Sequence, residues 1–306
     1  MKKSFFYLIV VALVSFFDLQ AASPIPESSK VGGFTLGCQA YSFNRYTLFE
    51  AIDKTKEAGG KTIELFLWQK LSPELPKIEV NAQMSDEHLN LLKEKLHTSG
   101  IRAVSAYFGN TAFTEKNPEA ALRKVFEFAK KLNMVSLTGE PPDASENFDL
   151  IEKLAKEYDL RFCLHNHRKD ETKPEYKNWD PTFTAELMKG RDPRMGFCLD
   201  TGHLVRSGLK PVEALKILEG RVHSLHLKDP ISETGHDTIF GQGVGDVKDV
   251  LKELKRQNFD GFISIEYEHN WTNSVPDIKQ CIDFVRREDL LNNWDKVDPS
   301  FPKKSP

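Results

Sequence analysis

The sequence predicts a single-domain (β/α)8 barrel, also called a TIM barrel, and three observations favour this fold. From Phe34 onward, short strand-like runs alternate with longer segments of helical period, eight times each. The pairs average about 32 residues, the size of one strand–helix step. Helix-start residues such as Ser85 and helix-stop glycines such as Gly100 lie at the boundaries. The alternative, an open doubly wound sheet, needs a glycine-rich phosphate turn after its first strand, whereas Gly32 and Gly33 precede that strand.

Each predicted strand is a short apolar run, and each predicted helix carries apolar residues at steps of three and four that form one packing face. In the third helix this face contains Leu122, Val125 and Ala129. A cap residue followed by proline, as in Asp180-Pro181, marks where a helix begins. The expected strands are Thr35–Tyr41, Thr62–Phe66, Arg102–Tyr107, Met134–Thr138, Arg161–His165, Met195–Leu199, Val222–Leu227 and Phe262–Tyr267. The expected helices are Leu48–Ala58, Asp86–Thr98, Glu119–Leu132, Phe148–Tyr158, Pro181–Lys189, Pro211–Glu219, Val247–Gln257 and Pro276–Glu288.

The N-terminus has the pattern of a secretory signal. Lys2 and Lys3 precede an apolar run over 5–17, and small residues around Ala22 suit a signal peptidase. The run is shorter than the roughly 20 residues that cross a bilayer, so we expect no stable membrane anchor. We therefore expect a signal peptide over 1–22, an extended lead-in over 23–33, the barrel over 34–288 and a C-terminal tail over 289–306. The mature protein is expected to be exported, either periplasmic or secreted.

Composition narrows the class of partner. The 306 residues include 42 basic and 45 acidic ones, so a net charge of −3 gives no bulk attraction to a nucleic-acid backbone, and we expect no nucleic-acid partner. Four cysteines are too few for a disulfide framework in a chain of this length, and we expect them to be buried apolar residues. The sequence leaves the oligomeric state open.

Ionisable residues follow the predicted strands at the position where a barrel of this kind carries its reacting groups. Taken singly, each has an ordinary structural explanation at the surface or in a hydrogen-bonded core. Their convergence on one mouth is informative, because unpaired like charges there repel strongly and a divalent cation relieves the repulsion. Carboxylates with imidazole suit Mn²⁺, Mg²⁺, Co²⁺ or Zn²⁺, and we expect one such ion. The converging residues are Glu140, Asp200, His226 and Glu266.

Four spaced motifs carry a resemblance to a known family: Leu164-His165-Asn166-His167, Cys198-Leu199-Asp200-Thr201-Gly202-His203, His226-Leu227-Lys228-Asp229 and Ser264-Ile265-Glu266. They resemble the xylose isomerase-like barrel superfamily, and within it the sugar phosphate isomerase/epimerase group, whose relatives include ketose 3-epimerases, inosose dehydratases and endonuclease IV. The resemblance implies metal ligands in the order Glu, Asp, His, Glu on strands five to eight.

Three of these ligands match Asp200, His226 and Glu266, but strand five carries His165 where the epimerase-like relatives have Glu. Two interpretations stay open: His165 is itself the fourth ligand, or Glu140 on the neighbouring strand supplies the missing carboxylate. This difference on strand five counts against the epimerase assignment, because the Glu at that position also moves the proton in ketose epimerases.

The expected chemistry is proton abstraction next to a carbonyl group, assisted by the ion. Glu266 or Glu140, together with His203, are the candidate general base and acid, and Lys228 is expected either to stabilise an oxyanion or to pair with Asp229. The expected substrate is a non-phosphorylated keto-sugar or cyclitol, because we find no phosphate-binding nest and sugar phosphates are scarce outside the cytoplasm. The residues expected to contact it are His167, Glu64, Tyr107 and Trp68.

Three other functions are alternatives to isomerisation or epimerisation. A keto-sugar dehydratase, which is a lyase acting by β-elimination, would use the same metal and base. A non-catalytic carbohydrate-binding barrel would tolerate loss of the metal. A nuclease resembling endonuclease IV would need further histidines on strands two and three, where this chain has Glu64 and the Ser105–Tyr107 region.

Overall fold

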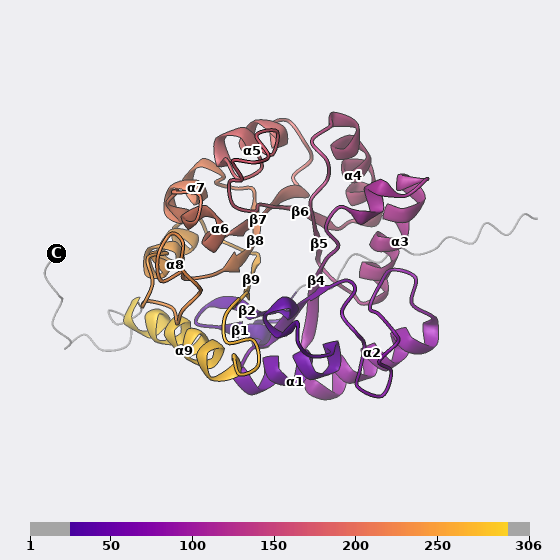
Figure 1. The fold of residues 1–306 in the computed structure, drawn as a ribbon, viewed down its shortest axis with the longest axis horizontal. Helices are drawn as coiled ribbons and strands as arrows, with labels where there is room; N and C mark the ends of the chain where they lie inside the picture. The colour runs from indigo at the N-terminus through magenta and orange to yellow at the C-terminus, as the bar shows by residue number, and fades with distance from the viewer. Residues whose placement is uncertain (1–24, 293–306) are drawn as a thin grey trace, which may run out of the picture.

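The computed structural model describes residues 25–292, and within them the chain closes into a barrel of eight parallel strands ringed by helices (Figure 1). Neighbouring strands follow chain order, and pairing of the first with the last closes the barrel. The predicted (β/α)8 fold is therefore confirmed. The barrel strands are β2 (Phe34–Gln39), β3 (Thr62–Phe66), β4 (Arg102–Tyr107), β5 (Ser136–Gly139), β6 (Arg161–His165), β7 (Met195–Asp200), β8 (Val222–Leu227) and β9 (Phe262–Ile265).

Helices cover the outside of the barrel and bury their apolar faces against the strands (Figure 1). In α3, Leu122, Val125 and Ala129 are all buried, as their spacing predicts. No helix among the described residues combines the length and apolar character needed to cross a bilayer. The helices are α1 (Leu48–Ala58), α2 (Asp86–Ser99), α3 (Pro118–Lys131), α4 (Ser145–Tyr158), α5 (Pro181–Met188), α6 (Thr201–Val205), α7 (Pro211–Ile217), α8 (Val247–Arg256) and α9 (Val275–Asn292), with short 3-10 helices η1 (Glu27–Ser29), η2 (Ala40–Phe43) and η3 (Thr111–Thr114).

The segment before the barrel differs from the expected extended lead-in. It contains η1 and a two-residue strand, β1 (Lys30–Val31), which pairs antiparallel with β2. Gly32 and Gly33 make this turn possible, because both have a left-handed backbone, with φ of 59° and 79°. At the other end α9 continues to Asn292, beyond the expected boundary at 288. The predicted signal peptide and most of the predicted tail lie outside the described residues.

Several elements near the barrel mouth differ from their predicted bounds, including β5 and β9, which end at Gly139 and Ile265 instead of Thr138 and Tyr267. The first barrel strand ends at Gln39 instead of Tyr41, because the Gln39 side chain accepts a hydrogen bond from the Tyr41 amide at 2.5 Å and caps η2. The short helix α6 was not predicted. The four cysteines are free and buried, as expected from their sequence context.

Gly37 allows β2 and β3 to pack closely, since a Cβ at this position would lie 1.7 Å from the Thr62 carbonyl oxygen. We expect Gly37→Ala to lower the free energy of unfolding by about 3 kcal/mol or more, because the two strands must separate. The matched control is Gly190→Ala, whose Cβ would meet nothing within 4 Å and whose φ of 77° costs only about 1–2 kcal/mol. Urea unfolding followed by circular dichroism compares the two, and equal losses would contradict the steric explanation.

Candidate metal and catalytic site

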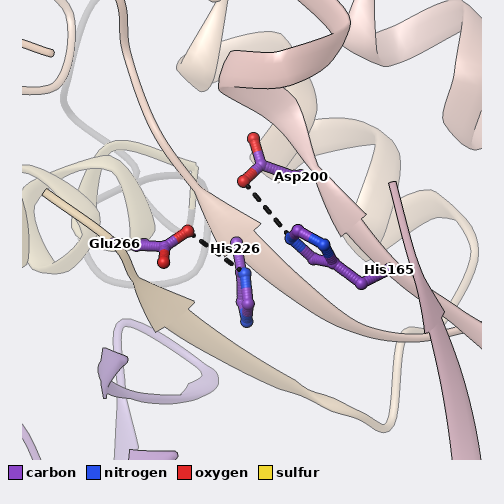
Figure 2. Close-up of side chains that lie close together, drawn as sticks. All are labelled: His165, Asp200, His226 and Glu266. Carbon is purple, nitrogen blue, oxygen red and sulfur yellow. Dashed lines mark ion pairs between the residues drawn. The ribbon is translucent and has the colours of Figure 1, made fainter. Parts of the chain in front are cut away.

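Four side chains from consecutive strands meet at the carboxyl ends of the barrel (Figure 2). His165 ends β6, Asp200 ends β7, His226 lies in β8, and Glu266 follows β9. One nitrogen or oxygen atom from each lies within 4.8 Å of the others, and all four residues are buried. We call this set the four-residue cluster.

The atoms that face one another in the four-residue cluster fit a divalent cation. His165 Nε2, Asp200 Oδ2 and His226 Nδ1 are buried and have no satisfactory hydrogen bond to a described residue, although Asp200 Oδ2 forms an ion pair with Lys228. His165 Nε2 lies 3.6 Å from Asp200 Oδ2, and His226 Nδ1 lies 3.2 Å from Glu266 Oε2. Burial disfavours a charged imidazole, yet Asp200 and Glu140 raise the pKa of His165 to about 10. The carboxylates thus leave negative charge that a cation would offset, and two imidazoles with two carboxylates suit a transition ion.

Each imidazole of the four-residue cluster contacts a carboxylate outside the cluster through its other ring nitrogen. Glu140 Oε1 lies 3.0 Å from His165 Nδ1, and Glu64 Oε2 lies 2.9 Å from His226 Nε2. Such partners fix the ring orientation and leave the other ring nitrogen available for a metal. The geometry therefore favours His165 over Glu140 as the fourth ligand. Glu64 was expected to contact substrate, but it is fully buried and supports His226, because β3 turns its side chain into the barrel interior.

These contacts predict different metal affinities for two variants. His165→Ala should abolish tight binding of Zn²⁺ or Mn²⁺, whereas Glu140→Gln should weaken it by about 10- to 100-fold, as for other residues that position a ligand. His167→Ala is the control, because His167 also contacts Glu140, with Nε2 2.8 Å from Oε1, but lies outside the four-residue cluster. Equilibrium dialysis measures the affinities. If Glu140→Gln lost more affinity than His165→Ala, Glu140 would be the ligand.

Lys228 is fully buried and lies among three carboxylates. Its Nζ lies 3.0 Å from Asp200 Oδ2 and 2.8 Å from an oxygen of each of Glu266 and Glu268. Burial opposes the charge, but these carboxylates outweigh it and raise the Lys228 pKa well above its ordinary value. The suggested pairing with Asp229 is wrong. Asp229 instead accepts hydrogen bonds from the glycine amides of the loop before α8, those of Gly241, Gly243 and Gly245.

Burial shifts the pKa values of two groups beside the cluster, Glu268 and His203. Burial and the nearby Glu266 carboxylate raise the pKa of Glu268, whereas the pKa of Glu266 stays low because Lys228 and His226 outweigh its burial. Burial also lowers the pKa of His203 to about 3, so its imidazole is neutral at pH 7. Asp200 Oδ1 positions His203 by accepting a hydrogen bond from its backbone amide at 2.7 Å, which caps α6.

These groups border a cavity of about 290 Å³ at the barrel mouth. Tyr107 lies in its wall and donates a hydrogen bond from its hydroxyl to Glu140 Oε1 at 2.6 Å. Glu64, Glu140 and Asp200 do not line the cavity. Glu268 is not among the site residues predicted from the sequence. Its spacing of two from Glu266 was a usable signal, because alternate residues of an extended chain share a face. The lining residues are Gln39, Tyr41, Phe66, Trp68, Tyr107, His165, His167, His203, His226, Lys228, Glu266 and Glu268.

Comparison with known proteins agrees with this architecture. Residues 52–288 match the protein family described as xylose isomerase-like TIM barrel. An inosose dehydratase of Clostridium tetani is 26% identical over 233 residues, which cover 61% of this chain and 76% of the relative.

Solved structures extend the comparison. An uncharacterised protein of Parabacteroides distasonis superposes with a TM-score of 0.64 and 32% identity, covering 82% of this chain and 98% of the other. The D-allulose 3-epimerase of a Methylomonas species, solved with D-allulose, superposes with a TM-score of 0.64 over 83% of this chain and 96% of the other. At 17% identity, the second likeness shows the shared fold alone.

Proposed function

The chain belongs to the xylose isomerase-like TIM barrel family, and from that premise we propose that it is a metal-dependent isomerase or epimerase that moves a proton next to the carbonyl group of a non-phosphorylated keto-sugar or cyclitol. The observation that carries this proposal is a single cavity that is lined by three members of the four-residue cluster and by two further titratable groups, Glu268 and His203. Burial raises the pKa of Glu268, which favours its protonated form, and lowers the pKa of His203, which keeps its imidazole uncharged.

The residues divide into three roles. His165, Asp200, His226 and Glu266 would hold the ion, which when bound polarises a carbonyl oxygen and so acidifies the neighbouring C–H group. Glu266, at the boundary of the ion site and the cavity, is the proposed base, and Glu268 shares Lys228 with it and is placed to relay the proton. His203, which lines the same cavity and is neutral, is placed to form a hydrogen bond with the substrate.

The cavity lining supports an uncharged substrate. Within the described residues no arginine lines it, and Lys228 is committed to three carboxylates. A phosphate group would therefore find neither an arginine nor an uncommitted lysine to bind it, whereas the hydroxyl groups of a sugar or cyclitol can bond to carboxylates, imidazoles and amides alike.

Dehydration is the second candidate, and the inosose dehydratase relative, 26% identical to this chain, favours it. Removal of the same proton followed by loss of a β-hydroxyl group needs one base and one acid, and the cavity supplies both. The products distinguish the two reactions, because an epimer or isomer keeps the mass of the substrate while a dehydration product lacks one water.

The proposal predicts proton exchange with solvent. With Mn²⁺ or Zn²⁺ added and a panel of keto-sugars and keto-cyclitols in deuterated water, we expect deuterium at the carbon next to the carbonyl, detected by NMR and mass spectrometry. The addition of EDTA should stop the exchange. Sugar binding that persists in EDTA, with no exchange on any compound, would support a non-catalytic carbohydrate-binding barrel instead.

We also propose that the protein is exported, which the N-terminal sequence pattern supports. Expression with the native N-terminus should give a mature protein that begins after Ala22, and mass spectrometry of the purified chain measures this directly. An intact N-terminus in the cytoplasmic fraction would contradict the export proposal without affecting the catalytic one.

A further inference from the structure

Trp68 combines an unusual backbone with an exposed ring at the barrel mouth. It follows β3 with a left-handed φ of 83°, and 40% of the residue is exposed. A bulky residue in this conformation carries about 1–2 kcal/mol of strain. The loop holds it there, because the Trp68 amide donates to the Val80 carbonyl at 2.8 Å and the Val80 amide donates to the Gln69 carbonyl at 2.8 Å. Strain held in place by its surroundings is typical of ligand-binding positions.

A second cavity, of about 480 Å³, lies against the catalytic one, and Tyr41, Phe66 and Trp68 line both. Tyr41 packs edge-on against Phe66, with ring centroids 5.3 Å apart, and is 38% exposed. Tyr41 and Trp68 therefore offer exposed aromatic surface to both cavities. We call the second space the Gln69 cavity, after the buried amide described next.

Gln69 lines this cavity with an acceptor that has no partner. The residue is 3% exposed, and its Nε2 donates to the carbonyl oxygens of Phe43 and Tyr46 at 3.3 and 2.9 Å, which fixes the amide. Its Oε1 is buried and accepts no hydrogen bond from any described residue. An unpaired buried acceptor costs about 1–3 kcal/mol, so a ligand hydroxyl group that reached Oε1 through a small shift of the cavity wall would gain a favourable hydrogen bond.

We propose that the Gln69 cavity binds a second sugar ring, so that the substrate is a two-ring keto-glycoside whose reacting ring occupies the catalytic cavity. The identity of the reacting ring rests on the proposed function, whereas the binding of a second ring does not. Aromatic faces suit the C–H face of a sugar ring and the Gln69 oxygen suits one of its hydroxyl groups, a combination common in small-molecule sites. The catalytic cavity alone, at about 290 Å³, is at the small end for such sites.

The first test compares the affinities of three sugars for the unmodified protein. Isothermal titration calorimetry of the metal-loaded protein with glucose, cellobiose and maltose should show at least one disaccharide binding about tenfold or more tightly than glucose. Trp68→Ala should bind the disaccharide more weakly. If the disaccharide changes the tryptophan fluorescence of the unmodified protein but not of Trp68→Ala, the ligand contacts the Trp68 ring. If neither disaccharide bound more tightly than glucose, the second-ring site would be overturned.

A matched pair of substitutions locates the site. Asn44 lines the Gln69 cavity but not the catalytic one, so Asn44→Phe should fill the space and lower the disaccharide affinity to that of glucose. Gln83→Phe makes a similar change in a cavity on another side of Trp68 and should keep the disaccharide preference. The opposite ranking would overturn the assignment to the Gln69 cavity. Tight disaccharide binding without proton exchange on any ketose would refute the proposed reaction and leave this site supported.

Discussion

Glu266→Gln is expected to reduce deuterium exchange by about 100- to 10,000-fold, the range that a general base contributes. The amide keeps the shape of the side chain but removes the negative charge that lies 2.8 Å from Lys228 Nζ and faces His226 Nδ1 at 3.2 Å. It therefore weakens the ion site and removes the base in one change. NMR of the exchange reaction at saturating metal separates these effects, because added metal restores occupancy but not the base.

Two controls make the result specific. Glu57→Gln alters an exposed residue of α1 and should leave the exchange rate unchanged. Glu268→Gln should slow the exchange without lowering metal affinity, since Glu268 lies outside the four-residue cluster. Exchange by Glu266→Gln within tenfold of the unmodified protein would exclude Glu266 as the base.

Lys228→Met is expected to change stability and metal affinity in opposite directions. In the metal-free protein it leaves Asp200 and Glu266 buried without their ammonium partner, which should lower the free energy of unfolding by about 3–5 kcal/mol. The same change removes a positive charge that repels an incoming cation, so Zn²⁺ or Mn²⁺ should bind more tightly and restore stability through linkage. Urea unfolding with EDTA and with saturating metal measures both effects.

The conservative substitution separates charge from packing. Lys228→Arg keeps a positive charge near the carboxylates and should lose less stability in EDTA than Lys228→Met. A loss for Lys228→Met that is the same with and without metal would show that Lys228 acts only through packing, and would contradict its competition with the ion.

The barrel could be predicted from sequence because each strand–helix step repeats the same local signals. The cap Ser85 and the stop Gly100 lie at their expected positions, and Thr62–Phe66 and Val222–Leu227 begin and end where predicted. The convergence of His165, Asp200, His226 and Glu266 followed from the same regularity, because parallel barrel strands deliver their last residues to one mouth.

What escaped prediction depends on contacts between distant residues. The 3.0 Å contact between Glu140 and His165 decides which of the two faces the cluster, and it joins neighbouring strands. The role of Glu64 is decided by its contact with His226, which lies 162 positions later in the sequence. The left-handed Trp68 carries no sequence signal such as glycine, since the loop around Val80 imposes it. Helix α6 is one and a half turns long and depends on a single cap, too little for periodicity to reveal.

That cap has an evolutionary consequence. Asp200 uses Oδ1 to begin α6, which carries His203, and leaves Oδ2 for the four-residue cluster. One carboxylate thus ties the ion site to the helix that aims the neighbouring imidazole. A longer Glu side chain would displace one contact or the other, so this position should tolerate no gradual drift. Substitutions at the aromatic rim, around Tyr41 and Trp68, would disturb neither contact of Asp200, so the shape of the cavity mouth could change while the four-residue cluster stayed intact.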